Sequence, residues 1–174
     1  IDVSVINLLF ISTVTNLRIN LPNDQLTILH CLCDKSNPYE TGGIIIGRYS
    51  NDSLTAHISE ISNSPDDSVK QRSFLNRGIK GLQKKLDMLW ENNYYYLGEW
   101  HYHPNSSPTP SGSDIKQMIS LSKNKKLNCP EPILIIIGGN KERWLQSVNV
   151  IANGNIIHFD DCLLYTSDAA DEAR

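Results

Sequence analysis

The chain has few of the features that mark secreted, membrane or nucleic-acid-binding proteins. Its 174 residues include four cysteines, too few for a disulfide-dense secreted scaffold, and only Cys31 and Cys33 lie close together. Positive charge is not in excess, since 16 Lys and Arg stand against 19 Asp and Glu, which argues against nonspecific binding to nucleic-acid phosphates. The stretch from Ile1 to Ile11 has no basic residues, so neither a signal peptide nor a membrane anchor is expected. These absences predict a cytoplasmic protein with no nucleic-acid or membrane partner.

Apolar periodicity predicts strands and helices that interleave along the chain. Strands are expected over residues 12–20, 41–47, 54–61, 94–101, 132–137, 144–152 and 156–159, and the apolar run 5–11 precedes or pairs with the first. Helices are expected over 24–33, with Asn23 as N-cap, over 77–91, and from Asp114 to about Ser122. The polar segments 62–72 and 105–113 read as loops. The predicted fold class is α/β (α+β), with a mixed β-sheet flanked by helices in a single domain.

Two histidines, His101 and His103, stand at the end of an expected strand. Side chains at i and i+2 of a strand point to the same face, so the two imidazoles converge. Asp114 follows eleven residues after His103, at the start of an expected helix, and its carboxylate can return to the same point. Two histidines and one carboxylate form the three-ligand set of a catalytic zinc site, which leaves a fourth position for water. A bare His-x-His pair is a weak signal, because most such pairs are half-buried strand residues.

The longer string around these residues is more specific. His101-x-His103-Pro104, followed by Ser111 and Asp114 at the spacing seen here, resembles the JAMM signature of the JAB/MPN metalloprotease family. A further match lies upstream, where Glu40-Thr41-Gly42-Gly43 resembles the separate glutamate segment of the same family. The segments around these motifs look like the prokaryotic JAB subgroup. The resemblance therefore implies a JAB/MPN-like fold and one bound Zn²⁺.

The resemblance assigns roles to five residues: His101, His103 and Asp114 as metal ligands, and Glu40 and Ser111 as catalytic residues. Glu40 would take a proton from the attacking water and pass it to the departing amine, and Ser111 would donate its hydroxyl to the oxyanion. Each also has an ordinary alternative, with Glu40 as a surface residue, Ser111 as a loop serine or helix cap, and Asp114 as an acid favoured at a helix start. Glu99 shares the face of the histidines and either orients an imidazole or has a cross-strand structural role.

The implied activity is zinc-dependent hydrolysis of an amide or isopeptide bond at the C-terminal tail of a ubiquitin-like modifier or conjugated protein. Similar JAB peptidases are encoded beside E1- and E2-like enzymes in bacterial operons, including CBASS antiphage systems, which implies antiphage defence and E1/E2-like partners. The substrate tail is expected as an added strand beside the active-site sheet, in contact with loops 62–76 and 105–113. A JAB protease that processes a sulfur-carrier protein in cofactor or cysteine biosynthesis and an inactive MPN-type scaffold or interaction module are alternatives. DNA-repair-associated relatives are disfavoured by Asn105-Ser106 after Pro104.

The resemblance covers Leu21 to Phe159 and predicts one JAB/MPN domain over residues 1–161. Because the chain opens at Ile1 rather than Met, we expect this domain to be N-terminally truncated. Residues 162–172 read CLLYTSDAADE, which resembles the translated read-through of a sequencing adapter. Residues 162–174 are therefore expected to be a non-native tail, and the alternative is an ordinary polar chain end.

Overall fold

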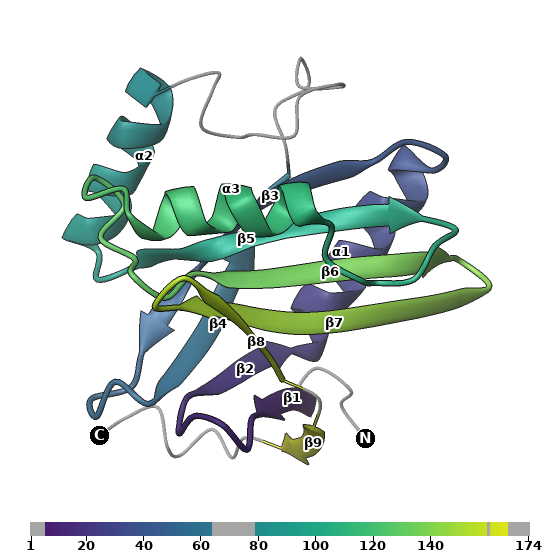
Figure 1. Ribbon diagram of the computed structural model, residues 1–174, viewed down its shortest axis with the longest axis horizontal. Coiled ribbons are helices and arrows are strands. Elements are labelled where there is room, and N and C mark those ends of the chain that lie inside the picture. The colour runs from purple at the N-terminus through teal and green to yellow at the C-terminus, as the bar shows by residue number, and fades with distance from the viewer. Residues whose placement is uncertain (1–5, 64–78, 160, 167–174) are drawn as a thin grey trace.

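The computed structural model describes residues 6–63, 79–159 and 161–166. In this part of the chain, nine strands form one curled sheet on which three helices pack (Figure 1). The strands are β1 (Ile6–Ile11), β2 (Arg18–Pro22), β3 (Thr41–Tyr49), β4 (Thr55–Ile61), β5 (Tyr95–Pro104), β6 (Ile133–Asn140), β7 (Arg143–Ala152), β8 (Asn155–His158) and β9 (Asp161–Thr166). The helices are α1 (Asn23–Ser36), α2 (Ile79–Glu91) and α3 (Gly112–Ser122).

The strand order is β8-β7-β6-β5-β3-β4-β2-β1-β9. The pairs β5–β6 and β2–β4 are parallel, and the other neighbouring strands are antiparallel. The predicted mixed sheet with flanking helices is therefore confirmed. No helix within residues 6–63 and 79–159 is both long enough and apolar enough to cross a membrane.

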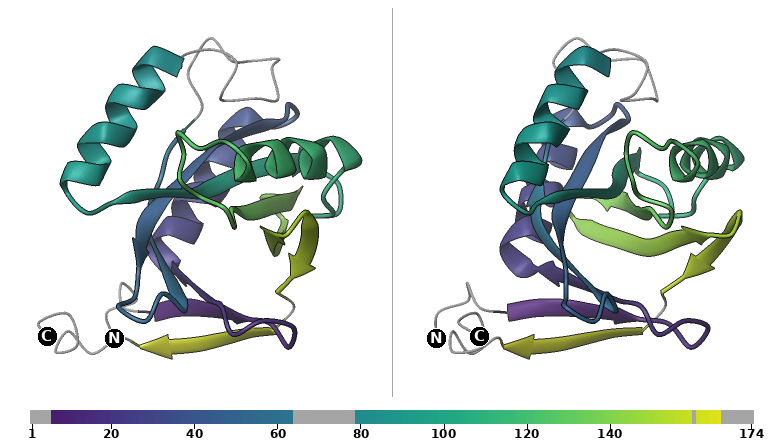
Figure 2. Two further views of the ribbon diagram at one scale, coloured as in Figure 1. Left: turned by 60° about the vertical axis from the view of Figure 1, so that its left-hand side comes forward. Right: turned by 90° about the vertical axis from the view of Figure 1, so that its left-hand side faces the viewer.

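The two faces of the central sheet bury different apolar clusters, because successive residues of a strand point to opposite sides. Ile133, Ile135 and Ile137 of β6 pack in the cluster that contains the buried side chains of α1, whereas Leu134 and Ile136 pack in the cluster of α3. Figure 2 shows α1 and α3 on opposite sides of the central strands. Cover on both faces accounts for the continuous apolar runs of β3 and β6.

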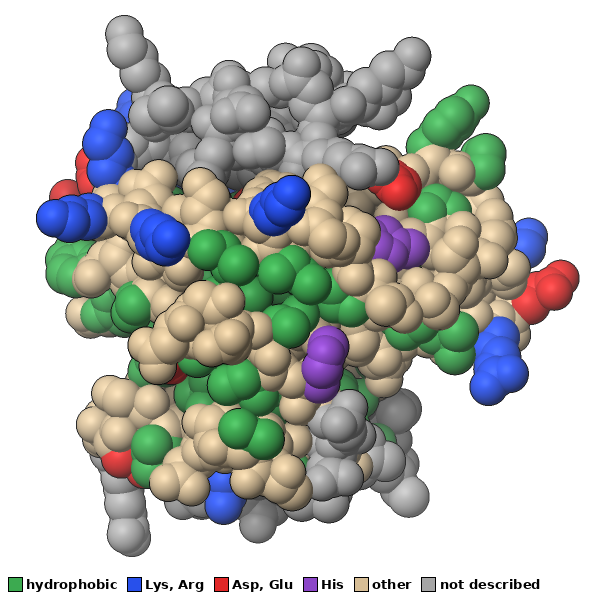
Figure 3. All heavy atoms as spheres, in the orientation of Figure 1, with side chains coloured by type: hydrophobic (Ala, Val, Ile, Leu, Met, Phe, Trp, Pro, Cys, Tyr) green, Lys and Arg blue, Asp and Glu red, His purple; other side chains and the backbone are tan. Residues whose placement is uncertain are grey.

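The α3 side of the sheet carries apolar surface as well as the polar site described below. On the face shown in Figure 3, apolar side chains gather between α3 and β8. Ile115 and Ile119 of α3 and Ile156 of β8 pack against the buried α3 cluster from outside. Helix α3 is therefore fixed by apolar contacts along its length, which holds its N-terminal end in place beside β5.

The prediction of a strand over residues 12–20 is confirmed for residues 18–20, which belong to β2, and wrong for residues 12–17, which connect β1 to β2. Ser12 accepts a hydrogen bond through Oγ from the backbone N–H of Val14 at 3.1 Å, and Thr15 does the same for Leu17 at 3.3 Å. Such local bonds from Ser and Thr stabilise turns at the expense of strand pairing. The expected pairing of the preceding apolar run with this strand is confirmed, since β1 pairs with β2.

The predicted N-cap of the first helix is also wrong. Helix α1 includes Asn23, and Pro22 occupies the cap position without a side-chain cap. The carboxylate of Asp24 accepts a hydrogen bond from the backbone N–H of Gln25 at 2.9 Å, so an acid in the first turn provides the acceptor. The helix continues to Ser36, beyond the expected end at residue 33.

The elements that carry the candidate site are longer than the sequence suggested. Strand β5 continues past its expected end at His101 to Pro104, because it pairs in parallel with β6 as far as Gly139. Helix α3 begins at Gly112, before the expected start at Asp114. Both histidines therefore lie inside β5, and a shorter loop than expected connects β5 to α3.

The remaining predictions concern the ends of the described segments. Residues 161–166 form β9, which pairs with β1 at the edge of the sheet. Strands β3, β4, β2 and β1 separate β9 from β5 in the sheet order. The non-native origin of residues 162–174 stays a prediction. The expected loop over 62–72, and most of the expected substrate contact over 62–76, lie outside the described residues from position 64 onward.

Candidate active site

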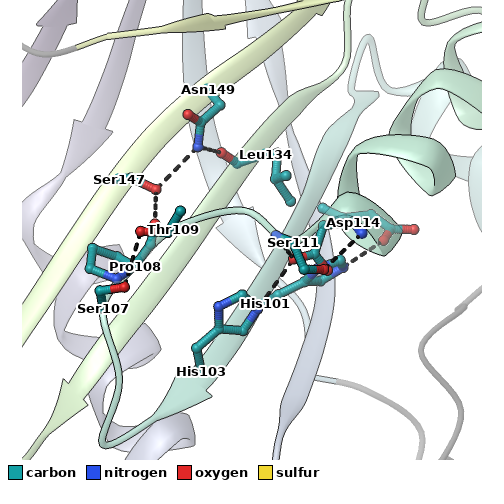
Figure 4. Close-up of polar contacts among 11 residues, drawn as sticks. His101, His103, Ser107, Pro108, Thr109, Ser111, Asp114, Leu134, Ser147 and Asn149 are labelled. Atoms are coloured by element: carbon teal, nitrogen blue, oxygen red, sulfur yellow. Dashed lines mark hydrogen bonds and ion pairs between the residues drawn. The ribbon is translucent and has the colours of Figure 1, made fainter.

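Strand β5 places its two histidines on the side of the sheet that faces α3. Trp100 and Tyr102 are fully buried in the cluster on the α1 side. Because side chains alternate along the strand, His101 and His103 point the other way, as Figure 4 shows. Their side chains keep 13% and 17% of their surface exposed. The site is therefore lined by partly buried imidazoles that solvent can still reach.

Asp114 is brought to these histidines by the first turn of α3. Ser111 is the N-cap, and its Oγ accepts a hydrogen bond from the backbone N–H of Asp114 at 3.1 Å. In return, Oδ2 of Asp114 accepts from the backbone N–H of Ser111 at 2.7 Å. This reciprocal pair is a capping box, which fixes the start of a helix and the direction of its side chains. The local sequence Ser-x-x-Asp therefore sets the Asp114 carboxylate in one orientation.

The Asp114 carboxylate contacts both imidazoles (Figure 4). Its Oδ1 lies 2.9 Å from Nδ1 of His101, and its Oδ2 lies 3.3 Å from Nε2 of His103. Asp114 itself is buried. The structure thus brings together four of the five residues singled out in the sequence, with Asp114 in contact with both histidines and Ser111 bonded to Asp114.

The ionisation of these groups reflects their mutual contacts. Burial lowers the pKa of His101, but hydrogen bonds to Asp114 and Glu99 and their negative charges raise it to about 9. Burial raises the pKa of Asp114, but hydrogen bonds from His101, His103 and the Ser111 backbone hold it well below its usual range. The carboxylates therefore make this site electronegative, and the site favours a cation.

Glu99 contacts the opposite edge of the His101 ring. Its Oε2 lies 3.0 Å from Nε2 of His101 and accepts a hydrogen bond from Nε2 of Gln117 at 3.1 Å. Glu99 was noted in the sequence as sharing the face of the histidines, whereas Gln117 was missed. A signal for Gln117 was available, because it follows Asp114 by three residues and therefore lies on the same face of α3.

Glu40 stands immediately before β3, the other neighbour of β5. In the antiparallel register, Thr41 is opposite Tyr102 and Gly42 is opposite His101. The glycine is required by this close approach, since a Cβ at Gly42 would lie 2.6 Å from the Trp100 carbonyl oxygen and 3.1 Å from Cδ2 of His101. Glu40 is exposed at the end of β3 that flanks the histidines. Its backbone is therefore placed beside the site.

The loop that carries Ser111 is fastened to β7. Ser147 donates a hydrogen bond from Oγ to the Pro108 carbonyl oxygen at 2.5 Å, and the buried Asn149 amide donates to Ser147 Oγ at 3.1 Å (Figure 4). Asn149 also donates to the Leu134 carbonyl oxygen at 3.1 Å. These contacts could not be predicted from local sequence, because the residues are far apart along the chain. They hold the loop that precedes Ser111 against the sheet.

The side chains at the site offer imidazole nitrogens and carboxylate oxygens, which are common metal ligands. In the described ranges, no group of three or more His, Cys, Asp and Glu side chains is arranged around one point as a metal shell, and Asp114 contacts the imidazoles directly. The donor chemistry nevertheless fits zinc, which takes imidazole nitrogen and carboxylate oxygen at about 2.0 to 2.2 Å. The Asp114 carboxylate uses a different oxygen for each contact, Oδ1 at 2.9 Å from His101 and Oδ2 at 3.3 Å from His103.

Comparison with known proteins gives a consistent picture. The family model described as prokaryotic homologs of the JAB domain matches residues 22–150. A "CD-NTase/cGAS isopeptidase" of Enterobacter hormaechei subsp. hoffmannii is 47% identical over 108 residues, which span 62% of this chain and 60% of that relative. A "probable metalloprotease" of Sinorhizobium fredii is 27% identical over 110 residues, spanning 61% of this chain and 66% of the relative. The matched part is thus less than two thirds of each relative's length.

Among solved structures, the solution structure of the protein DSY2949 from Desulfitobacterium hafniense has a TM-score of 0.56 and 17% sequence identity to this chain. The match covers 78% of this chain and 85% of that one. At this level of identity the likeness concerns the fold alone, and it agrees with the sheet and helices described above.

Proposed function

Because the chain belongs to the prokaryotic JAB family, we propose that it is a zinc-dependent isopeptidase of the JAMM type. The observation that carries this proposal is the contact of the Asp114 carboxylate with both histidines of β5. Two imidazoles and one carboxylate are the protein ligands of one class of catalytic zinc site. The proposed reaction is hydrolysis of an amide or isopeptide bond at the C-terminal tail of a ubiquitin-like modifier or conjugated protein.

In this proposal His101, His103 and Asp114 hold the zinc ion. When bound, zinc would supply Lewis acidity that activates a water molecule and polarises the scissile carbonyl. The capping box at Ser111 supports the assignment, because it leaves the Asp114 carboxylate in one orientation toward β5.

Glu40 is the proposed general base and acid. Its position before Thr41, on the strand that pairs with Tyr102 and His101, puts an exposed carboxylate at the edge of the histidine site. A carboxylate there can take a proton from the attacking water and deliver it to the departing amine, provided that it comes within hydrogen-bond reach. Its exposure leaves the side chain accessible to a substrate.

Ser111 is the proposed hydroxyl donor to the oxyanion. In the capping box its Oγ acts as an acceptor for the Asp114 N–H, so the hydroxyl hydrogen is not used by that bond. The fastening of the preceding loop to β7 limits the movement of this hydroxyl. A donor held in advance of the reaction stabilises developing negative charge without further reorganisation.

The substrate tail has a restricted choice of strand edges. Strands β3 and β5 are interior strands of the sheet, so a tail cannot pair with β5 along its length. The last pair of β4 with β3 joins Ile61 to Ile45, and Ser62 still bonds to the backbone of Ile44. Strand β3 continues from there toward Glu40. We place the tail beside this continuation of β3. The relatives named "CD-NTase/cGAS isopeptidase" support a conjugated CD-NTase as the substrate. Antiphage defence is proposed as the setting on the resemblance to the JAB peptidases of CBASS operons.

The direct test combines metal content with cleavage of a defined substrate. A nucleotidyltransferase of the CD-NTase type, joined through its C-terminus to a lysine of a second protein, is incubated with the zinc-loaded chain. Intact-mass measurement should show both parts released with the addition of one water, and a chelator should stop the reaction. A chain that binds no zinc and leaves the amide bond intact would overturn the proposal.

A further inference from the structure

Glu99 is a buried carboxylate, and the unfavourable free energy of its burial needs an explanation. Only 2% of its surface is exposed, and its Oε1 has no hydrogen-bond partner among the residues that the structure describes. Burial of a carboxylate with an unsatisfied oxygen is unfavourable unless a specific contact offsets it. The contacts that the structure does give Glu99 both involve Oε2, with His101 and Gln117. The buried charge is therefore directed at the His101 ring.

His101 is held at both ring nitrogens. Nδ1 lies 2.9 Å from Oδ1 of Asp114, and Nε2 lies 3.0 Å from Oε2 of Glu99. A histidine that binds a metal must present a lone pair at one nitrogen and carries its hydrogen at the other. In the structure both nitrogens face carboxylate oxygens. Loss of the Nδ1 hydrogen on metal binding, with the Nε2 hydrogen still donated to Glu99, would leave the Nδ1 lone pair on the side of Asp114.

Helix α3 contributes to both ends of this arrangement. Asp114 contacts Nδ1 of His101, and Gln117, three residues later, donates its amide N–H to the Glu99 oxygen at 3.1 Å. Residues three apart lie on the same helix face, so the position of α3 fixes the two contacts together. Loss of either contact would therefore change the orientation of the His101 ring.

We propose that Glu99, oriented by Gln117, is a positioning residue that holds His101 with its Nε2 hydrogen toward Glu99 and its Nδ1 lone pair toward the metal. This inference rests on the proposed zinc site. It assigns the buried Glu99 a role through His101, outside direct contact with substrate. It also predicts which nitrogen of each ligand faces the metal, Nδ1 for His101 and Nε2 for His103, since these are the atoms beside Asp114.

The test measures zinc affinity by competition with a chromophoric chelator. Glu99→Leu should bind zinc about 10- to 100-fold more weakly, the usual effect of losing an outer partner of a ligand. Gln117→Leu should weaken binding in the same direction but less. Glu99→Gln should lose less than Glu99→Leu, because its amide oxygen can accept the same hydrogen bond. The matched control is Asn20→Leu, which removes another buried polar side chain with an unpartnered oxygen, on β2, and should leave zinc affinity unchanged.

A spectroscopic measurement separates positioning from a general loss of stability. In zinc-loaded protein labelled with ¹⁵N, long-range imidazole spectra should show a hydrogen on Nε2 of His101 that exchanges slowly with water. Glu99→Leu should lose this slow exchange, and Asn20→Leu should keep it. The spectrum reports the ring itself, so a merely structural role for Glu99 would leave it as in the wild type.

The outcomes are distinct for the inference and for the proposed function. A folded Glu99→Leu variant with wild-type zinc affinity and an unchanged His101 spectrum would overturn the inference and leave the proposed function intact. If Glu99→Leu does not fold, Gln117→Leu decides, because it leaves the buried carboxylate in place; unchanged zinc affinity and an unchanged His101 spectrum in that variant would overturn the inference. Undiminished zinc binding by His103→Ala would instead show that the proposed site itself is wrong.

Discussion

Asp114 of α3 lies with its Oδ2 3.3 Å from Nε2 of His103 on β5. These two groups come from different elements and meet because the capping box orients the first turn of α3. If both are zinc ligands, loss of either one leaves an incomplete shell. The same contact also explains why the ordinary explanation of Asp114 as a helix-start acid and the proposed ligand role do not exclude each other.

The first prediction is that His103→Ala loses stoichiometric zinc. Removal of an imidazole leaves two protein ligands, fewer than the three of catalytic zinc sites. Metal content after dialysis, measured by mass spectrometry, checks this. The control is His158→Ala, which removes a histidine of β8 that bonds to Asn149 but is not a proposed ligand, and should keep one zinc per chain. Equal zinc content in the two variants would contradict the ligand assignment.

The second prediction concerns Glu40→Gln. The amide cannot take up the proton of the attacking water, so turnover should fall by roughly 100-fold or more. Zinc content should stay at the wild-type level, since Glu40 is not among the proposed ligands. Cleavage rate and metal content are measured on the same preparation. Glu60→Gln, at another exposed glutamate on β4, serves as the control and should cleave normally. Full activity of Glu40→Gln would contradict the proposed role of Glu40 in proton transfer.

The third prediction separates the two roles of Ser111. Ser111→Ala should lose both the helix cap, worth about 1 kcal/mol, and the oxyanion donor. Ser111→Gly lacks the hydroxyl but costs only a few tenths of a kcal/mol as an N-cap, whereas Ser111→Thr keeps the hydroxyl. We expect kcat to fall for Ala and Gly alike and to persist for Thr, with zinc retained throughout. A kcat that follows the melting temperature across the three variants would show that the cap alone matters.

The candidate site could be found from sequence because its signals are local. His101 and His103 alternate with buried aromatic residues on one strand, and Ser111 and Asp114 form a capping box within one turn. Spacing along the chain determines such arrangements. The contact of Gln117 with Glu99 depends on α3 lying over β5. The contact of Asn149 with Leu134 depends on the pairing of β6 with β7. Both arrangements arise from tertiary packing.

The boundaries of the elements were less predictable for the same reason. Strand β5 passes His101 because β6 offers it a partner, and no local pattern near Tyr102 reports that pairing. In the segment before β2, β-branched residues suggested a strand, but Ser and Thr side chains bonded to the backbone and formed turns instead. Propensity was outweighed there by local hydrogen bonds.

The fourth prediction concerns the proposed non-native tail. A chain that ends at Asp161 should keep the zinc content and cleavage rate of the full chain, because four strands separate β9 from β5. Metal content and initial rates of the two chains check this. A third chain, which ends at Phe159, is measured in the same way. It lacks all of β9 but keeps Phe159, a buried member of the α1-side cluster. A marked loss of zinc or activity on removal of residues 162–174 would contradict the prediction.

The fifth prediction is a pH dependence of stability that originates at His30. Burial lowers the pKa of His30, whose ring stacks on Trp144 at 5.0 Å between centroids and whose Nε2 is buried without a partner among the described residues. The unfolded chain, with the ordinary pKa near 6.5, therefore takes up a proton more readily than the folded protein. The contribution of His30 to the free energy of unfolding is fully present above pH 6.5 and is lost as pH falls through the lower pKa of the folded state.

His30→Phe keeps an aromatic ring against Trp144 but cannot take up a proton. Urea unfolding at several values from pH 7.5 to 5 should therefore show a smaller loss of stability on acidification for this variant than for the wild type. The other titrating groups are common to both proteins, so the difference between the two curves isolates His30. Parallel curves for the wild type and His30→Phe would show that burial of His30 does not resist protonation.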